Sequence, residues 1–379
     1  MIAFYVSGHG LGHASRQIEI INAVRRLHPG ARISVRSSAA RWLFDLTLSS
    51  PVELEAAACD TGIVQIDSLR PDVEASLREA ASFVRTIDER ARREAEWLSA
   101  SGTRLVVGDI PPLAFMAARR AGLPSVAIAN FTWDWIYEGY ATVHREAAPL
   151  AARLGTLYGL ADAAWRLPMY GGFEGMASVA DLPLVARRSH RDPTEVRTAL
   201  GLPGDERLAL VSFGGYGLDG LALARAAATS GHRVVVVEGG AGKRRTAPDR
   251  RVHVIAEADV YGAGYRYEDL VRAVDVVVTK PGYGIVAECA ANDTAMLYTS
   301  RGWFREYDVL VEALPRYLRS AYIPQEALLR GEWREAMDRL EKAAAPLERP
   351  RTDGAERAAR ALVTLAEGGR AALDPGVSP

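Results

Sequence analysis

The feature that most constrains the fold is an alternation, along the whole chain, of short apolar runs with segments of helical periodicity. In the first half of the chain, the apolar runs lie at residues 2–6, 33–35, 52–57, 105–107 and 126–129. Segments with apolar residues at helical spacing lie between them, at residues 16–28, 39–48, 73–100 and 112–121. Regular alternation of strands and helices indicates a parallel sheet covered by helices on both faces.

The second half of the chain repeats this alternation after a connection at residues 183–203. Its predicted strands lie at residues 208–213, 233–238, 252–255, 275–279 and 295–299. Its predicted helices lie at residues 218–228, 267–273, 285–291 and 356–366. The sequence therefore predicts two Rossmann-like, doubly wound parallel-sheet domains, residues 1–185 and 186–369, followed by a disordered tail at 370–379. The last helix can pack back on the first domain. A ligand is expected in the cleft between the carboxyl ends of the two sets of strands.

Composition limits the class of protein and of partner. A chain of 379 residues fits two domains, and a formal net charge of −1 without a basic stretch argues against nucleic acid as a partner. The two cysteines, Cys59 and Cys289, lie far apart and are expected to be buried thiols. No apolar run approaches the roughly 18 residues that span a bilayer, and no secretory leader pattern is present. We therefore expect a cytoplasmic protein, as a monomer or a homodimer.

Glycines follow the first predicted strand in a pattern close to a dinucleotide-binding loop. Gly8, Gly10 and Gly12 match the fingerprint, but His13 replaces its last glycine. Residues 36–38, Arg-Ser-Ser, stand where the fingerprint has an acidic residue at the end of the second strand. A nicotinamide cofactor is therefore not expected.

The same loop carries two histidines, His9 and His13, which a plain glycine turn does not require. His13 lies at the start of the first helix, where a histidine favours the neutral form that a general base requires. Asp109 ends another strand of the same predicted sheet, so its carboxylate can accept a hydrogen bond from one ring nitrogen while the other faces a substrate. The alternative, two unrelated polar residues, stays open on these grounds.

A second glycine cluster predicts a phosphate site in the second half. Gly282 and Gly284 close a strand and open a helix, so their backbone amides can hold a phosphate. Glu288, one turn into that helix, can accept two hydrogen bonds from a ribose. Gly214 and Gly215 close a neighbouring strand in the same way. A tight turn followed by a solvated glutamate is the structural alternative.

An aromatic stretch at residues 131–137, Phe-Thr-Trp-Asp-Trp-Ile-Tyr, follows the strand at 126–129. We expect it to form a loop. Its rings can stack on sugars or hold an apolar acceptor, or they can fill the space between the two halves.

Several of these stretches resemble one family. The matching segments are SGHGLGHASR at 7–16, DTGIVQIDSL at 60–69, VVGDIPPLAF at 106–115, NFTWDWIYEGY at 130–140, DLPLVARRSHRDPTEVRTALG at 181–201, SFGG at 212–215, KPGYGIVAECA at 280–290 and RGWFREY at 301–307. From about residue 2 to 345 the chain resembles the N-terminal glycosyltransferase-like region of plant L-arabinokinases and its stand-alone bacterial relatives. It is more distantly similar to GT-B glycosyltransferases. The kinase domain is not part of the resemblance, so sugar phosphorylation is not implied.

The resemblance implies roles for particular residues. His13 matches the general base of sugar transferases with this fold, and Asp109 matches the residue that orients that base. Gly282, Gly284 and Glu288 match the residues that bind the diphosphate and the ribose. The acidic residue that often holds donor-sugar hydroxyls corresponds to Glu306. One departure is Ile285, which stands where Thr or Ser usually contacts a phosphate; Lys280 or Arg301 can take over that contact.

The resulting hypothesis is a GT-B glycosyltransferase that moves a sugar, with inversion, from a nucleotide-diphosphate sugar to the hydroxyl of a small-molecule or glycan acceptor. A UDP-sugar is the favoured donor, and no metal or resident cofactor is expected. The predicted donor site comprises Gly214, Gly215, Lys280, Gly282, Tyr283, Gly284, Glu288, Arg301 and Glu306. The predicted acceptor site comprises His9, Arg16, Phe131, Trp133 and Asp134. The alternatives are a nucleotide-sugar epimerase or hydrolase of the same fold, and a non-catalytic binding protein.

Overall fold

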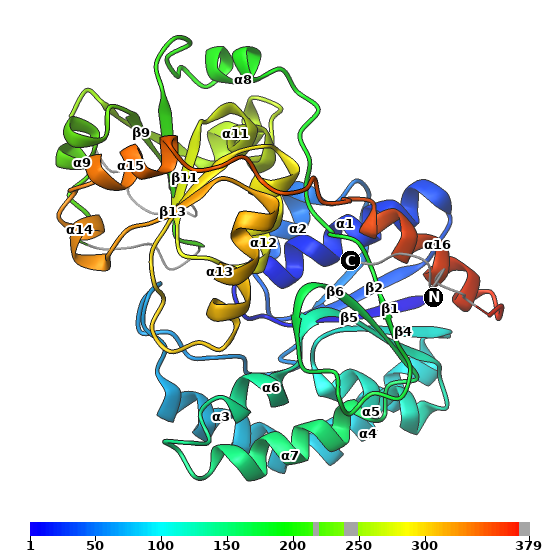
Figure 1. Ribbon diagram of the computed structural model, residues 1–379. Coiled ribbons are helices and arrows are strands. Elements are labelled where there is room, and N and C mark those ends of the chain that lie inside the picture. The colour runs from blue at the N-terminus through cyan, green and yellow to red at the C-terminus, as the bar shows by residue number, and fades with distance from the viewer. Residues whose placement is uncertain (215–219, 239–248, 371–379) are drawn as a thin grey trace.

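The structure of the chain is a computed structural model that describes residues 1–214, 220–238 and 249–370. The predicted donor residue Gly215 and the predicted tail beyond residue 370 lie outside the described residues. Within the described ranges, the strands form two separate parallel sheets, each flanked by helices (Figure 1). The predicted α/β class with two doubly wound domains is confirmed.

The first domain is built on a seven-stranded parallel sheet with the strand order β3-β2-β1-β4-β5-β6-β7. Its strands are β1 (Ile2–Val6), β2 (Ile33–Ser37), β3 (Glu53–Ala56), β4 (Leu105–Asp109), β5 (Ser125–Phe131), β6 (Ala163–Gly171) and β7 (Val179–Asp181). Its helices are α1 (Gly12–Leu27), α2 (Arg41–Thr47), α3 (Val73–Arg85), α4 (Ile87–Ala100), α5 (Pro112–Ala121), α6 (Trp133–Glu138) and α7 (Ala147–Tyr158).

The central strand β1 is buried on both faces, as a strand in such a sheet must be. Phe4 and Val6 on one face pack in the same apolar cluster as residues of α1. Ala3 and Tyr5 on the other face pack with α4 and α5. The period of two along the strand thus brings one set of side chains to each helical layer.

Two predicted segments differ from the structure. The single helix predicted over 73–100 is two helices, which break at Thr86 because its hydroxyl donates to the Phe83 carbonyl at 3.0 Å and competes with the helical ladder. The loop predicted at 131–137 is the end of β5 followed by α6. Trp133, Ile136 and Tyr137 follow helical spacing and form the buried face of α6.

The second domain has a six-stranded parallel sheet with the order β10-β9-β8-β11-β12-β13. Its strands are β8 (Leu208–Ser212), β9 (Arg233–Glu238), β10 (Val252–Ala256), β11 (Val276–Thr279), β12 (Ala295–Tyr298) and β13 (Ser320–Tyr322). Its helices are α8 (Pro193–Ala199), α9 (Leu223–Ser230), α10 (Glu257–Gly262), α11 (Tyr267–Ala273), α12 (Tyr283–Ala291), α13 (Glu306–Tyr317), α14 (Gln325–Leu329) and α15 (Arg334–Glu341).

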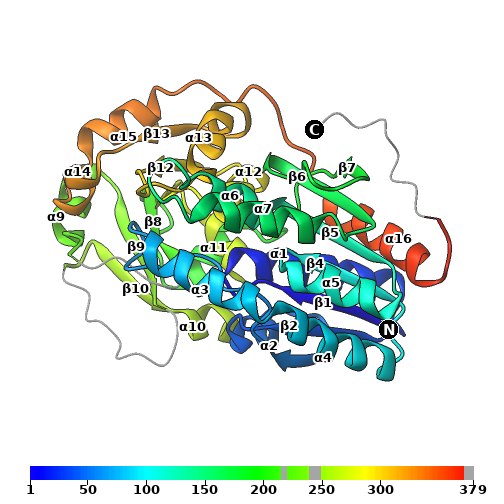
Figure 2. The ribbon, with the colours of Figure 1, turned by 90° about the horizontal axis from the view of Figure 1, so that it is seen from below.

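The last helix, α16 (Gly354–Ala366), lies apart from the other late elements. It packs beside α1, on the first domain, in both ribbon views (Figures 1 and 2). Ala358, Ala359 and Leu362 are fully buried there, in the cluster that covers one face of the first sheet. The chain therefore crosses between the domains twice. The two crossings pair with each other, since the Leu184 amide donates to the Arg351 carbonyl at 3.0 Å.

The domains touch where two helices begin. A Cβ added to Gly284, in the first turn of α12, would lie 3.6 Å from the Cα of Gly12, the first residue of α1. Glycine at both positions lets the two backbones come this close. The aromatic rings of Phe131 and Tyr283 stack across the same boundary, with centroids 5.7 Å apart. The predicted cleft is thus closed at this point.

Both cysteines, Cys59 and Cys289, are free and buried, as predicted. Across the described ranges, no helix combines the length and the apolar composition needed to cross a bilayer.

Candidate active site

The structure brings His13 and Asp109 together at the edge of the first sheet. Asp109 ends β4, which pairs with β1, and His13 is the second residue of the helix that follows β1. The Nδ1 atom of His13 lies 2.8 Å from Oδ1 of Asp109, whose side chain is fully buried. A carboxylate can only accept, so in the neutral ring the proton is on Nδ1 and Nε2 keeps its lone pair. This is the tautomer that a general base needs.

Asp109 has two further partners that sequence reasoning did not assign to it. Arg16 donates from Nε to Oδ2 at 2.9 Å and from Nη2 to Oδ1 at 2.7 Å. Gln17 donates to Oδ2 at 2.9 Å. Burial alone would raise the pKa of Asp109, but the charges of Arg16 and His13 outweigh it and hold this pKa at about 2. The carboxylate is therefore ionised and fixed in orientation.

Arg16 was predicted to bind the acceptor, and the structure gives it a different position. Its guanidinium is buried between Asp109 and Asn130, and it donates to the amide oxygen of Asn130. The i, i+3 spacing from His13 on α1 is the sequence signal that could have joined Arg16 to the histidine and its carboxylate.

His9 is partly exposed and lies on the loop between β1 and α1. Its Nδ1 accepts the backbone N–H of Ile63 at 3.3 Å. Its ring meets Trp133 edge-on at 5.4 Å and stacks on Phe304 of the second domain, with centroids 6.3 Å apart and planes inclined by 6°. Burial of the ring and the neighbouring charges lower the pKa of His9 well below its ordinary value.

The predicted acceptor aromatics are packing residues in this structure. Phe131 and Trp133 are each 2% exposed. Phe131 meets the His13 ring edge-on at 5.4 Å, and the Trp133 ring packs against both histidines, with its centroid 6.1 Å from that of His13. The structure does not bring Asp134 to them, because its carboxylate faces α7, where a Cβ on Gly155 would lie 3.3 Å from Oδ2.

Asp60 is a polar residue of this site that the prediction missed. Its carboxylate accepts the indole N–H of Trp133 at 2.8 Å. Burial raises the pKa of Asp60, against the lowering effect of its hydrogen bonds with Ser7 and Trp133. A signal was present, because Asp60 follows the third parallel strand at the same edge of the sheet as Asp109.

The second domain contributes two cations next to its glycine turn. Lys280 follows β11, and burial together with the charge of Arg301 lowers the pKa of Lys280 to about 7. Arg301 follows β12, forms a buried ion pair with Glu306 and lies 4.0 Å over the ring of Phe304. Gly282 caps α12, so the amides of the predicted phosphate turn stand at a helix start beside these cations. Gly214 lies just after β8, with a left-handed φ of +73°.

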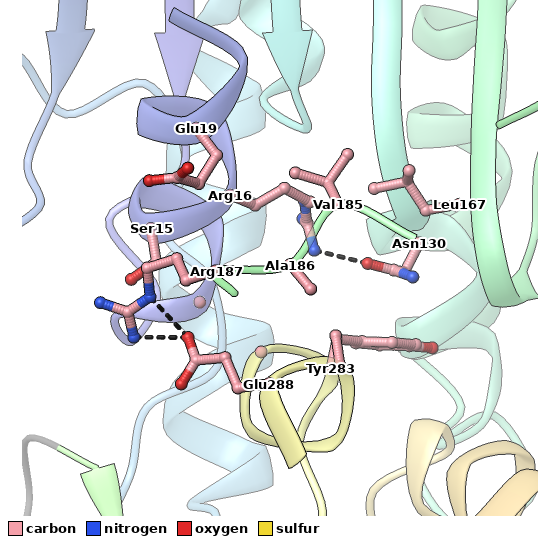
Figure 3. Close-up of a pocket in the computed structure, with 13 residues that line it drawn as sticks. Ser15, Arg16, Glu19, Asn130, Leu167, Val185, Ala186, Arg187, Tyr283 and Glu288 are labelled. Carbon is pink, nitrogen blue, oxygen red and sulfur yellow. Dashed lines mark hydrogen bonds and ion pairs between the residues drawn. The ribbon is translucent and has the colours of Figure 1, made fainter. Parts of the chain in front are cut away.

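Glu288 lies in a small cavity between α1, α12 and the connection that joins the domains (Figure 3). Arg187, from that connection, donates from Nε to Oε1 of Glu288 at 2.6 Å. Glu288 is 4% exposed, and its burial raises its pKa against the opposing charge of Arg187. The cavity measures about 20 Å³, enough for one water molecule. A cavity of this size has no room for a ribose beside Glu288.

Comparison with known proteins finds no family model that matches the chain. The chain is 30% identical over 381 residues to the L-arabinokinase of Arabidopsis thaliana, an alignment that covers 99% of this chain and 35% of that protein. The chain thus spans about a third of the length of this relative. It is also 26% identical over 307 residues to a UDP-N-acetylglucosamine–N-acetylmuramyl-(pentapeptide) pyrophosphoryl-undecaprenol N-acetylglucosamine transferase of Clavibacter sepedonicus, covering 79% of this chain and 76% of that protein.

Among solved structures, the calicheamicin glycosyltransferase CalG4 is similar to this chain, with a TM-score of 0.58 and 17% sequence identity. The superposition covers 96% of this chain and 94% of CalG4. This chain has the GT-B fold. A putative UDP-N-acetylglucosamine 2-epimerase of Listeria monocytogenes is also similar, with a TM-score of 0.58 and 14% sequence identity. The superposition covers 98% of this chain and 97% of the epimerase chain. The predicted homology to the glycosyltransferase-like part of L-arabinokinase is confirmed, and the homologous and structurally similar proteins include glycosyltransferases.

The GT-B chain divides the candidate site between its two domains. The first domain contributes His9, His13 and Asp109, and the second contributes Lys280 and Arg301, with the glycine turn beside them. The two groups meet across the line of contact where α1 and α12 begin. A substrate held by both groups would therefore bridge the domains.

Proposed function

We propose that this chain is an inverting glycosyltransferase that uses a nucleotide-diphosphate sugar, with a UDP-sugar as the favoured donor. The acceptor is the hydroxyl of a small molecule or a glycan, and His13 is the general base. The observation that carries the proposal is the 2.8 Å contact of His13 Nδ1 with the buried Asp109, across the domain boundary from the glycine turn at Gly282. Homology to a UDP-N-acetylglucosamine transferase supports the donor class.

In the proposed reaction, Nε2 of His13 takes the proton of the acceptor hydroxyl. The acceptor oxygen forms a bond to the anomeric carbon as the bond from that carbon to the diphosphate oxygen breaks. The proton stays on the imidazole, and the diphosphate leaves with the bonding electron pair. A single displacement from the opposite face inverts the anomeric carbon. Asp109, next to Nδ1, stabilises the imidazolium that forms.

The leaving diphosphate gains negative charge as the sugar departs. Lys280, Arg301 and the amides at the start of α12 stand on the second-domain side, where such charge would be stabilised. Fixed cations and backbone dipoles that are already oriented need no reorganisation during the reaction. We therefore propose transfer without a metal or a resident cofactor.

Nucleotide entry requires a change at the domain boundary. Small-molecule sites have volumes of about 300–1,000 Å³, whereas the cavity at Glu288 measures about 20 Å³. Separation of α1 from α12 and release of Glu288 by Arg187 would open the ribose position. The structure is thus consistent with a closed form of the cleft.

The experiment that tests the proposal is a thermal-shift series with UDP-, TDP-, GDP- and ADP-sugars and the free nucleotides. A ligand that binds the folded chain raises its melting temperature by mass action. We expect a shift with UDP-sugars and UDP. The absence of a shift with every nucleotide would remove the donor site and with it the proposed function.

Incubation with the donor alone then separates transfer from the alternatives. Release of a sugar epimer or of free sugar at a useful rate would favour the epimerase or hydrolase. Binding without turnover across a broad set of acceptors would favour a binding protein.

A further inference from the structure

His9 has no role in the reaction as proposed above, yet several elements hold it in place. Ile63 donates its backbone N–H to Nδ1 of His9 at 3.3 Å. Gly62, beside it, has a left-handed φ of +61°, and a Cβ there would lie 2.7 Å from the Cβ of His9. Glycine is therefore required for the loop to close over the imidazole.

The hydrogen bond from Ile63 determines the tautomer of His9. A nitrogen that accepts from a backbone N–H carries no proton itself, so in the neutral ring the proton is on Nε2. Within the described part of the chain, Nε2 has no hydrogen-bond partner. The ring is thus a neutral side chain with one N–H available for donation.

The surroundings of His9 in the second domain are cationic. Its ring stacks on Phe304, and the guanidinium of Arg301 lies over the same Phe304 ring. Lys280 is close enough to His9 to affect its charge state. Glu306 pairs with Arg301, whereas Lys280 forms no ion pair within the described residues. Below pH 7, where Lys280 is mostly protonated, one positive charge is therefore in excess at this point of the cleft.

A neutral N–H donor, two cations and the amides at Gly282 form a set that fits a multiply charged anion. We propose that His9 donates its Nε2–H to a phosphate oxygen of the nucleotide-diphosphate donor, opposite Lys280 and Arg301. This inference rests on the proposed function and moves His9 from the predicted acceptor site to the donor site. The diphosphate is then held from both domains, and His9 stabilises the leaving group without transferring a proton.

The test compares His9→Asn with His9→Gln in calorimetric titrations with UDP and with uridine. Asn keeps an oxygen near Nδ1 that can accept from Ile63 but has no group at the position of Nε2. Gln has an amide that reaches that position. His144→Asn, on the connection between α6 and α7, is the matched control.

We expect His9→Asn to weaken UDP binding roughly tenfold, the loss typical of a hydrogen bond to a charged group. Uridine affinity should stay at the wild-type value, because uridine has no phosphate. His9→Gln should recover most of the UDP affinity, and His144→Asn should match the wild type. If His9→Asn does not fold, His9→Phe, which keeps the ring stack on Phe304, takes its place.

Equal UDP affinity in the wild type and the donor-deficient variant would overturn the role of His9 and leave the proposed function standing. An equal loss for UDP and uridine would also overturn it, because the effect would then not depend on phosphate. Failure of the wild type to bind UDP, TDP, GDP or ADP would overturn the proposed function itself.

Discussion

Arg187 donates to the carboxylate of Glu288 at 2.6 Å, so a residue of the domain connection occupies the group that is predicted to bind ribose. The pair is buried, and Glu268 lies within ion-pair distance of the same guanidinium. Nucleotide binding and the position of the connection therefore compete for one side chain.

Replacement of Arg187 by Gln should lower the stability of the fold and raise its affinity for uridine. Removing one partner of a buried ion pair costs about 3–5 kcal/mol, so the melting temperature should fall. The uridine affinity of the folded fraction should rise, because Glu288 no longer has to be released. Arg188→Gln, at the exposed neighbouring position, is the control and should change neither quantity. Weaker uridine binding by Arg187→Gln would mean that Arg187 helps to hold the nucleotide.

Replacement of His13 by Ala should remove turnover and leave donor binding intact. A positioned general base contributes about 10²- to 10⁴-fold to the rate, and its imidazole is the proposed base here. The measurements are the rate of sugar transfer and the UDP dissociation constant of the same preparation. Turnover near the wild-type rate would exclude His13 as the base.

Replacement of Asp109 by Asn should change the acid stability of the chain. The pKa of Asp109 is about 2 in the fold and 3.8 in the unfolded chain, so its contribution is complete above pH 4 and is lost as the pH falls toward 2. This difference corresponds to about 2 kcal/mol. Urea unfolding between pH 6 and pH 2.5 should show a smaller loss of stability for Asp109→Asn than for the wild type. An equal loss of unfolding free energy in the two proteins would show that Asp109 does not cause the acid sensitivity.

The pKa of about 7 for Lys280 predicts a pH-dependent affinity for diphosphates. The free chain loses the proton of Lys280 as the pH rises through 7, whereas a bound diphosphate favours the charged amine. UDP affinity should therefore fall between pH 7 and pH 9, by up to about tenfold per pH unit. Lys280→Arg, which keeps its charge throughout, should bind UDP equally well across this range. A flat profile for the wild type would place Lys280 outside the phosphate site.

Part of the candidate site could be predicted because parallel strands end at a common edge. The pairing of Val6 with Asp109 in adjacent strands follows from the strand–helix pattern, and it brings His13 within reach of that carboxylate. The two domains and most of their strands follow from the same pattern.

Other contacts depend on where distant segments pass each other, which local patterns do not contain. The path of the connection decides that Arg187 reaches Glu288, and the closure of the cleft decides that Phe304 covers His9. β6 was missed because Pro168 interrupts its run, and the pairing of β5 with β6 shifts register between Ala129 and Phe131.

The position of α16 has a consequence for how the chain folds during synthesis. Leu362 and its neighbours complete the apolar cluster on β1 and α1, yet the ribosome adds them after the entire second sheet. Until then, the part of that apolar surface that α16 covers is exposed on the nascent chain, which favours binding of a chaperone or premature association. The first domain to emerge is thus the last to be completed.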